Sequence, residues 1–204
     1  MLIWTAAMRC RHSSDMAQLD LPFTRARSER ILLRKAVSVD LDAYVEMSAD
    51  PEVRRYLGGP VSAQRLRARI EARGIASVTE DPGAFVIAEP SSGQLLGTLM
   101  LERRSAHRRG HVEPDADELE VSYLLRRRSW GQGLATEAVS LLLRTAAAHL
   151  PDQTVLAVTQ SSNLLSLALA QRIGFAYAGT FTEFDAEQWL GVGRLHTLGR
   201  VEQG

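Results

Sequence analysis

Alternation of apolar and polar residues is clearest at residues 118–125, ELEVSYLL. In an extended strand, successive side chains point to opposite faces of the sheet. One face would therefore carry Leu119, Val121, Tyr123 and Leu125, and the other Glu118, Glu120, Ser122 and Leu124. This pattern predicts a central strand with an apolar face for the core and a polar face that lines a cleft.

Shorter apolar runs predict strands at 31–34, 84–89, 95–102, 154–159 and 175–184, and a weaker one at 195–198. The turn residues 90–94 join the second and third of these runs as an antiparallel hairpin. The polar sequence DAEQ and two glycines separate the last two runs. The charged segment 105–117 has no periodicity and is predicted to be an exposed loop or insertion.

Helical spacing and capping residues predict helices at 40–50, 62–73, 134–150 and 163–173, with a short helical turn at 51–57. Asp40, Ser62 and Asn163 are the expected N-caps of three of them, and Gly74 and Gly174 are the expected C-terminal stops. The order of elements predicts a mixed α/β layer fold. The strands near Glu118 and Thr154 would be parallel neighbours joined by a helix.

The composition is that of one soluble domain of 204 residues, which we place at 19–204 behind a tail of residues 1–18. Twenty-four Lys+Arg balance 24 Asp+Glu, so no global field favours nucleic acid or an anionic membrane as a partner. Cys10 is the only cysteine, which excludes an internal disulfide and fits a reducing cytoplasm. His107 and His111 lack a third well-spaced ligand, and we expect no metal site.

The turn after the central strand carries the main candidate chemistry. Gly131 and Gly133 let the backbone approach a ligand, and the first amides of the following helix are unpaired donors at the positive end of its dipole. This combination suits a pyrophosphate, although a GxG before a helix is by itself better explained as plain turn geometry.

Residues 128–135, RSWGQGLA, resemble the acyl-CoA pyrophosphate signature R/Q-x-x-G-x-G/A of the GNAT superfamily of N-acetyltransferases. Residues 163–166, NLLS, followed by Gly174 and Phe175, are similar to a second segment of that superfamily that contacts the pantetheine arm. The resemblance covers about Ser28 to Gly199. It is closest to the ribosomal-protein alanine and serine N-acetyltransferase branch, whose usual start is similar to residues 28–34.

The resemblance implies a single α+β domain with a mixed, mostly antiparallel twisted sheet, a central parallel strand pair splayed to admit acyl-CoA, and helices on both faces. It also implies acetyl-CoA as co-substrate and an amine acceptor, either a peptide N-terminus or a small molecule, with direct transfer in a ternary complex. The resemblance leaves open whether the protein forms a homodimer. The residues implied to bind acyl-CoA are Leu124, Leu125, Arg126, Arg128, Gly131, Gln132, Gly133, Leu134, Ala135, Thr136, Asn163 and Ser166.

For catalysis, Glu120 is the first candidate to accept the amine proton and Glu118 the second, and the branch suggests Ser166 as proton donor to the thiolate. An amide near Leu124 or Leu125 would polarise the carbonyl. Many superfamily members carry a tyrosine acid where this chain has Ala170. The alternatives are a Glu120 paired with an arginine, a Ser166 bonded to its own helical turn, and a non-catalytic acyl-CoA-binding module.

Further polar and aromatic residues are expected to lie outside the chemistry. Glu183 and Asp185 would be solvated near the end of the chain. Tyr44, Tyr56 and Trp189 are expected to pack in the core or at an edge more readily than to line an acceptor pocket.

Overall fold

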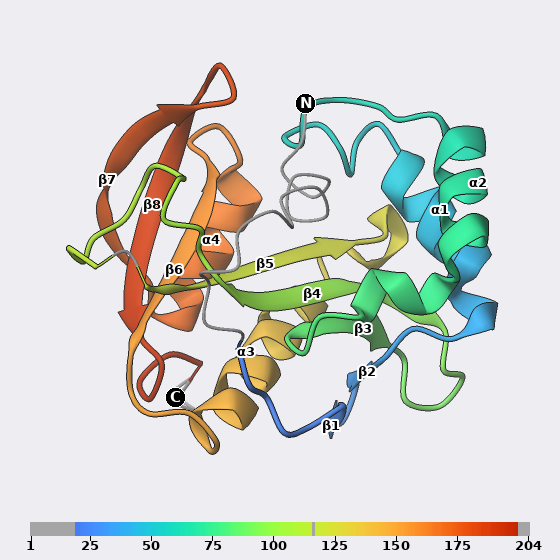
Figure 1. The fold of residues 1–204 in the computed structure, drawn as a ribbon, viewed down its shortest axis with the longest axis horizontal. Coiled ribbons are helices and arrows are strands. Elements are labelled where there is room, and N and C mark those ends of the chain that lie inside the picture. The colour runs from blue at the N-terminus through green and yellow to red at the C-terminus, as the bar shows by residue number, and fades with distance from the viewer. Residues whose placement is uncertain (1–18, 116, 200–204) are drawn as a thin grey trace.

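An eight-stranded sheet with the order β1-β2-β3-β4-β5-β6-β8-β7 forms the centre of the computed structural model, which describes residues 19–115 and 117–199 (Figure 1). The strands are β1 (Arg25–Arg27), β2 (Leu32–Arg34), β3 (Ala84–Ala88), β4 (Leu95–Arg103), β5 (Leu119–Leu125), β6 (Thr154–Gln160), β7 (Ala176–Glu183) and β8 (Ala186–Arg194). The helices are α1 (Leu41–Ala49), α2 (Ala63–Arg73), α3 (Leu134–Ala147) and α4 (Leu164–Ile173). The expected fold class is confirmed: the sheet is mostly antiparallel, and β5 and β6 are its parallel pair.

The parallel pair separates along its length. Its register joins Leu119 to Val155 and Glu120 to Leu156, and no pairing follows for the rest of β5. In Figure 1, β6, β8 and β7 run steeply across the direction of β4 and β5. The sheet is therefore splayed from Val121 onward, as expected for this strand pair.

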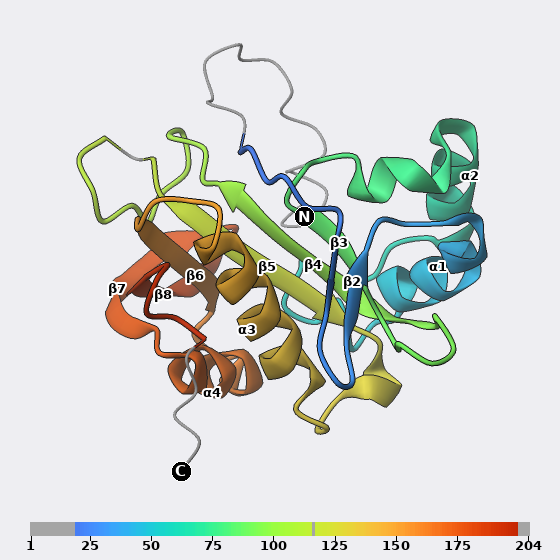
Figure 2. The same cartoon turned by 90° about the horizontal axis from the view of Figure 1, so that it is seen from below.

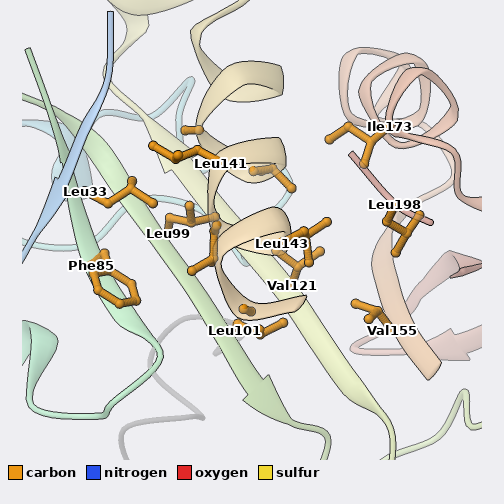
Figure 3. Packing of buried hydrophobic residues seen from close by; sticks show 14 of the residues in the cluster. Leu33, Phe85, Leu99, Leu101, Val121, Leu141, Leu143, Val155, Ile173 and Leu198 are labelled. Atoms are coloured by element: carbon orange, nitrogen blue, oxygen red, sulfur yellow. The ribbon is translucent and has the colours of Figure 1, made fainter. Parts of the chain in front are cut away.

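Helices cover both faces of the sheet (Figure 2). α3 packs against the larger apolar cluster, where Leu141 and Leu143 lie over Leu99 and Val121 of the central strands (Figure 3). α1 and α2 enclose a second cluster on the opposite face, around Val86 of β3. The alternation in β5 accounts for this arrangement, because its odd-numbered residues join the first cluster and Leu124 joins the second.

Two of the three expected helix caps are confirmed. The Ser62 hydroxyl accepts a hydrogen bond from the Arg65 amide, and the Asn163 side chain accepts one from the Ser166 amide. Asp40 precedes α1, but its carboxylate instead accepts hydrogen bonds from the Arg34 guanidinium and the Val37 amide. Asp40 therefore forms an ion pair with Arg34 of β2 and does not cap α1 with its side chain. Residues 51–57 form turns where a short helix was expected.

The strand expected at 195–198 is wrong, because these residues form turns and the last strand is β8. The two glycines expected to separate strands lie inside β8. A Cβ at Gly191 would lie 2.3 Å from the Trp189 ring, and one at Gly193 would lie 2.5 Å from Leu198. These glycines therefore leave room for large side chains that pack across the strand.

The tail expected at residues 1–18, with Cys10, lies outside the described residues. Within 19–115 and 117–199, no helix is long and apolar enough to cross a membrane.

Candidate active site

The turn between β5 and α3 is held in an open shape by its two glycines. Gly131 and Gly133 have φ angles of 72° and 74°, in the left-handed region that glycine adopts without strain. The Trp130 indole N–H donates to the carbonyl of Leu125 at 2.9 Å, which fixes the turn to the end of β5. The first amides of α3 have no preceding helical turn to bond and are available to an anion.

Glu137 in the first turn of α3 ties this turn to the start of the domain. Its carboxylate accepts a hydrogen bond from the Ser28 hydroxyl at 2.7 Å and from the Arg30 guanidinium at 2.8 Å, and Arg30 also donates to the carbonyl of Gln132. Burial would raise the pKa of Glu137, but these hydrogen bonds outweigh it and lower the pKa. The residues near Ser28 thus brace the glycine turn from outside.

The edge of β5 that faces β6 has unpaired backbone groups. Arg104 donates its amide to Glu118, and Arg126 donates its amide to Leu96, so even-numbered residues of this segment bond toward β4. The amides of Val121, Tyr123 and Leu125 therefore point toward the gap. Of the two expected carbonyl-polarising amides, that of Leu125 faces the gap and that of Leu124 is turned toward β4.

Ser166 of α4 meets Tyr123 of β5 across this gap. The Tyr123 hydroxyl donates to Ser166 Oγ at 3.1 Å. Burial raises the pKa of Tyr123, against the smaller opposite effect of its hydrogen bond to Ser166, and the phenol stays protonated at neutral pH. The alternation in the sequence had placed Tyr123 on the apolar face only. Its proximity to Ser166, 43 positions away, depends on how α4 packs.

A cavity of about 610 Å³ fills the space between the separated strands, a size typical of small-molecule sites. It extends from the glycine turn, along β5 and α4, to Glu120. The expected site residues that line it are Glu120, Leu124, Leu125, Gly131, Gly133, Leu134, Ala135, Thr136, Asn163 and Ser166. Tyr56 also lines it, whereas Tyr44 and Trp189 are buried in the apolar clusters.

Three residues expected to bind the cofactor do not line this cavity. The Arg126 side chain is 7% exposed and is paired with Glu46 of α1. Arg128 and Gln132 are exposed on the outer side of the turn, where the Gln132 side-chain amide donates to the Arg128 carbonyl. The resemblance to the family signature placed all three in the expected set, and in the structure their side chains point away from the cavity.

Glu120, at the end of the cavity where β5 and β6 pair, is 5% exposed and bonded to two guanidinium groups. Its Oε2 accepts from Arg104 at 2.6 Å and from Arg108 at 3.0 Å. Among the described residues Oε1 has no hydrogen-bond partner. The pairing with arginine that the sequence left open is thus present, and it leaves one carboxylate oxygen free.

Glu118, the second candidate base, organises the loop 105–117 instead. Its carboxylate accepts hydrogen bonds from the amides of Val112 and Glu113 at 2.7 and 2.8 Å, and it bonds His111 Nδ1 at 2.6 Å. Burial would raise its pKa, but the hydrogen bond with His111 and those from the two amides outweigh it and lower the pKa. Both oxygens are used, which leaves Glu118 a structural residue.

Glu102 of β4 is an acidic residue that no sequence pattern had singled out. It lies directly opposite Glu120 in the β4–β5 register, so both side chains are on the same face of the sheet. Burial and, secondly, the charge of Glu120 raise the pKa of Glu102 to about 8. The hairpin prediction had put Glu102 at a strand end, and only the register of β5 on β4 reveals the pair.

Glu183 at the end of β7 is not solvated as expected. Its Oε2 accepts from Arg108 at 2.9 Å and lies 3.8 Å from the Arg104 guanidinium. Arg108 therefore bridges Glu120 and Glu183, two acidic residues from strands far apart in sequence.

Comparison with known proteins agrees with this geometry. The family model described as "Acetyltransferase (GNAT) domain" matches residues 30–176, which include β2 to α4 and the start of β7. The chain belongs to the GNAT acetyltransferases. In this family, acetyl transfer from CoA to an amine is the general reaction.

Two similar proteins, both named as acetyltransferases, illustrate the range of similarity. An N-acetyltransferase of Bacillus licheniformis, named uncharacterized N-acetyltransferase p20, is 24% identical over 160 residues, which are 78% of this chain and 85% of that protein. The crystal structure of a GNAT-family acetyltransferase from Bacillus anthracis has a TM-score of 0.68 at 17% identity, covering 84% of this chain and 99% of that one.

Spermidine N-acetyltransferase from Vibrio cholerae, solved in complex with CoA and spermine, has the same fold. Its TM-score is 0.62 at 16% identity, and the match covers 83% of this chain and 98% of that chain. At such identities the likeness shows the fold alone.

Proposed function

We propose that the protein is an acetyl-CoA-dependent N-acetyltransferase that transfers the acetyl group directly to an amine within a ternary complex. The observation that carries this is the cavity between β5 and β6, which joins the glycine turn at one end to Glu120 at the other. Anion donors, a free strand edge and a carboxylate thus follow one another along a single channel.

The residues present fit acetyl-CoA. The open turn at Gly131 and Gly133 and the first amides of α3 would hold its pyrophosphate, and the unpaired edge of β5 would accept its pantetheine arm as an added strand. Asn163 caps α4 beside this path. When bound, acetyl-CoA supplies the activated acetyl thioester.

Glu120 is the proposed base. A primary amine is protonated at neutral pH and must lose a proton before it attacks a carbonyl. The carboxylate of Glu120, whose Oε1 is bonded to no described residue, accepts that proton directly or through water. Arg104 holds the carboxylate in a fixed orientation, and the amides of the β5 edge polarise the carbonyl.

Ser166 and Tyr123 are the proposed proton donors to the thiolate. Because the Tyr123 hydroxyl donates to Ser166 Oγ, the hydroxyl proton of Ser166 is free to point into the cavity. The pair would supply the proton that a tyrosine at the position of Ala170 supplies in many relatives.

The first test is thermal stability with and without acetyl-CoA. A ligand at 100 times its dissociation constant adds about 2.7 kcal/mol of stability. For a domain of this size that raises the Tm by roughly 5–10 °C. No shift at saturating acetyl-CoA would contradict the proposal.

The second candidate function is a non-catalytic acyl-CoA-binding module, and Ala170 favours it, since the usual acid is absent there. A thiol-release assay across peptide N-termini, polyamines, aminoglycosides and amino acids separates the two. Both candidates predict the thermal shift, and only the enzyme releases CoA in step with an acceptor.

The acceptor is proposed at the level of an amine. The start at residues 28–34 supports the ribosomal-protein N-acetyltransferase branch, which names a branch and not a substrate, and the Vibrio cholerae relative supports a small polyamine. A peptide N-terminus or a polyamine, like acetyl-CoA, is available in the cytoplasm, where we propose that the protein acts.

A further inference from the structure

Arg108 differs from the other arginine at Glu120 in how it is held. The Arg104 side chain is fully buried, donates to the Arg109 carbonyl as well as to Glu120, and lies over the Phe181 ring. The Arg108 side chain is 26% exposed, and its polar partners among the described residues are the carboxylates of Glu120 and Glu183 alone. The Arg104 side chain is thus fixed by packing and by backbone contacts as well as by ion pairs, whereas the Arg108 side chain is held by its two ion pairs.

The backbone around Arg108 is anchored independently of its side chain. On one side the Arg104 guanidinium bonds the Arg109 carbonyl, and on the other Glu118 bonds the amides of Val112 and Glu113. Gly110 lies against β7, because a Cβ there would lie 2.3 Å from the Phe181 ring. The loop runs beside β7 and β8 in Figure 1. The Arg108 guanidinium can therefore leave by rotation of its side chain, without unfolding the loop.

The place that Arg108 occupies is acidic. Glu120 and Glu183 share two guanidinium groups, and Glu102 lies opposite Glu120 in the sheet, so removal of Arg108 leaves Glu120 and Glu183 with Arg104 alone. Within this cluster Glu120 lines the cofactor cavity, and Arg108 and Glu183 lie beyond it. A neutral group in place of Arg108 would leave buried carboxylates uncompensated, which is costly, whereas a cation would restore the balance.

Resting on the function proposed above, we infer that the Arg108 guanidinium occupies the position of the acceptor amine, and that the acceptor is a cationic amine with a second positive charge. The reacting amine takes the place of the guanidinium at Glu120, and the second charge binds Glu183. Arg108 therefore acts as a built-in competitor that excludes neutral and singly charged amines.

The test compares Arg108→Ala with Arg109→Ala, a neighbouring arginine whose side chain is exposed and whose carbonyl is retained. The probes are 1,4-diaminobutane and the monoamine n-butylamine, with binding followed by calorimetry and KM by thiol release. Arg108→Ala is expected to bind the diamine roughly tenfold more tightly than wild type, because the partly buried ion pair between Arg108 and Glu120 no longer competes with the diamine. Arg109→Ala should match wild type.

Glu183→Gln gives the complementary result. It is expected to raise the KM for the diamine roughly tenfold and to leave the KM for n-butylamine within about twofold, because only the diamine has a charge for Glu183. Arg108→Met, which keeps the aliphatic stem, repeats the first test if Arg108→Ala unfolds.

Equal diamine affinity in the Arg108 and Arg109 variants would overturn the inference, as would equal affinity of Arg108→Ala for diamine and monoamine. Acetyl-CoA thermal shifts are recorded on every variant. A shift without the diamine effects contradicts only the inference about Arg108, whereas absence of the shift contradicts the proposed function itself.

Discussion

The glycine turn and Glu120 lie at opposite ends of β5 and are held by different kinds of contact. The turn takes its shape from residues close in sequence, for example through the hydrogen bond from Trp130 to Leu125, and Arg30 only braces it from outside. Glu120 is fixed by Arg104 and Arg108, which come from the end of β4 and from an irregular loop. The cofactor end is thus a local backbone structure, and the acceptor end is a charge network assembled across the fold.

This difference predicts that substitutions can impair the glycine turn and the charge network around Glu120 independently. A change in the turn should affect acetyl-CoA binding, whereas a change in the charge network should affect turnover and acceptor choice. The following variants test that separation, from the largest expected effect to the smallest.

Glu120→Gln should lower kcat by about 100-fold or more, the usual contribution of a general base. The amide is nearly isosteric and retains an oxygen for Arg104, so the acetyl-CoA thermal shift should persist. Glu118→Gln is the control on the same strand face. It should lower the Tm by loosening the loop 105–117 and reduce kcat only a few-fold. Equal kcat losses in the two variants would show that Glu120 has no special role.

Gly131→Ala should weaken acetyl-CoA binding roughly tenfold, because a Cβ at this turn strains the backbone and projects toward the ligand. Gly93→Ala is a matched control, since both glycines have φ near +70° and no atom within 4 Å of the position that a Cβ would take. Both variants should lose about 1 kcal/mol of unfolding free energy. Only Gly131→Ala should have a smaller Tm shift on addition of acetyl-CoA. Equal Tm shifts in the two variants would show that the turn does not bind acetyl-CoA.

The same contrast explains what the sequence could and could not predict. The turn, the caps at Ser62 and Asn163, and the parallel strand pair follow from local patterns, and the structure contains all of them. The pairing of Glu120 with Arg108, the position of Glu183 and the opposition of Glu102 to Glu120 depend on strand register and loop packing. Residues 105–117 have no periodicity, so no sequence pattern indicated that this loop reaches Glu120.

The weak prediction for residues 195–198 failed for a related reason. Gly191 and Gly193 look like strand breaks, yet in β8 they make room for Trp189 and Leu198. A glycine that ends a strand and one that admits a bulky neighbour are identical in sequence. A similar ambiguity applies to Tyr123. The alternation predicts only that its ring faces the core, and it does not predict that its hydroxyl reaches Ser166.

Ser166→Ala should lower kcat about tenfold and Tyr123→Phe several-fold, less than the usual contribution of a single positioned proton donor, because each variant retains the other hydroxyl. If Tyr123 acts through Ser166, the double variant should be no slower than Ser166→Ala alone. Independent, multiplicative losses would show that the two hydroxyls act separately. Unchanged kcat in both single variants would exclude the proposed donor pair.

Glu102→Gln should change stability in a pH-dependent way and leave the cofactor end untouched. Burial and the charge of Glu120 raise the pKa of Glu102 to about 8 in the folded protein, above its ordinary value of 4.5. Between these values the folded state holds a proton that the unfolded state has lost, so the contribution of Glu102 is fully present below about pH 4.5 and is lost as the pH rises through about 8.

A glutamine at position 102 cannot ionise and avoids this loss. Compared with wild type, Glu102→Gln should gain at least about 1 kcal/mol between pH 5 and pH 8, or roughly 2–4 °C in Tm. Glu89→Gln, at an exposed position in the β3–β4 turn, is the control and should have no such trend. A Tm difference between wild type and Glu102→Gln that stays constant from pH 5 to pH 8 would mean that Glu102 ionises normally. Glu102 would then be ionised at neutral pH, and burial beside Glu120 would not distinguish this end of β5 from the turn.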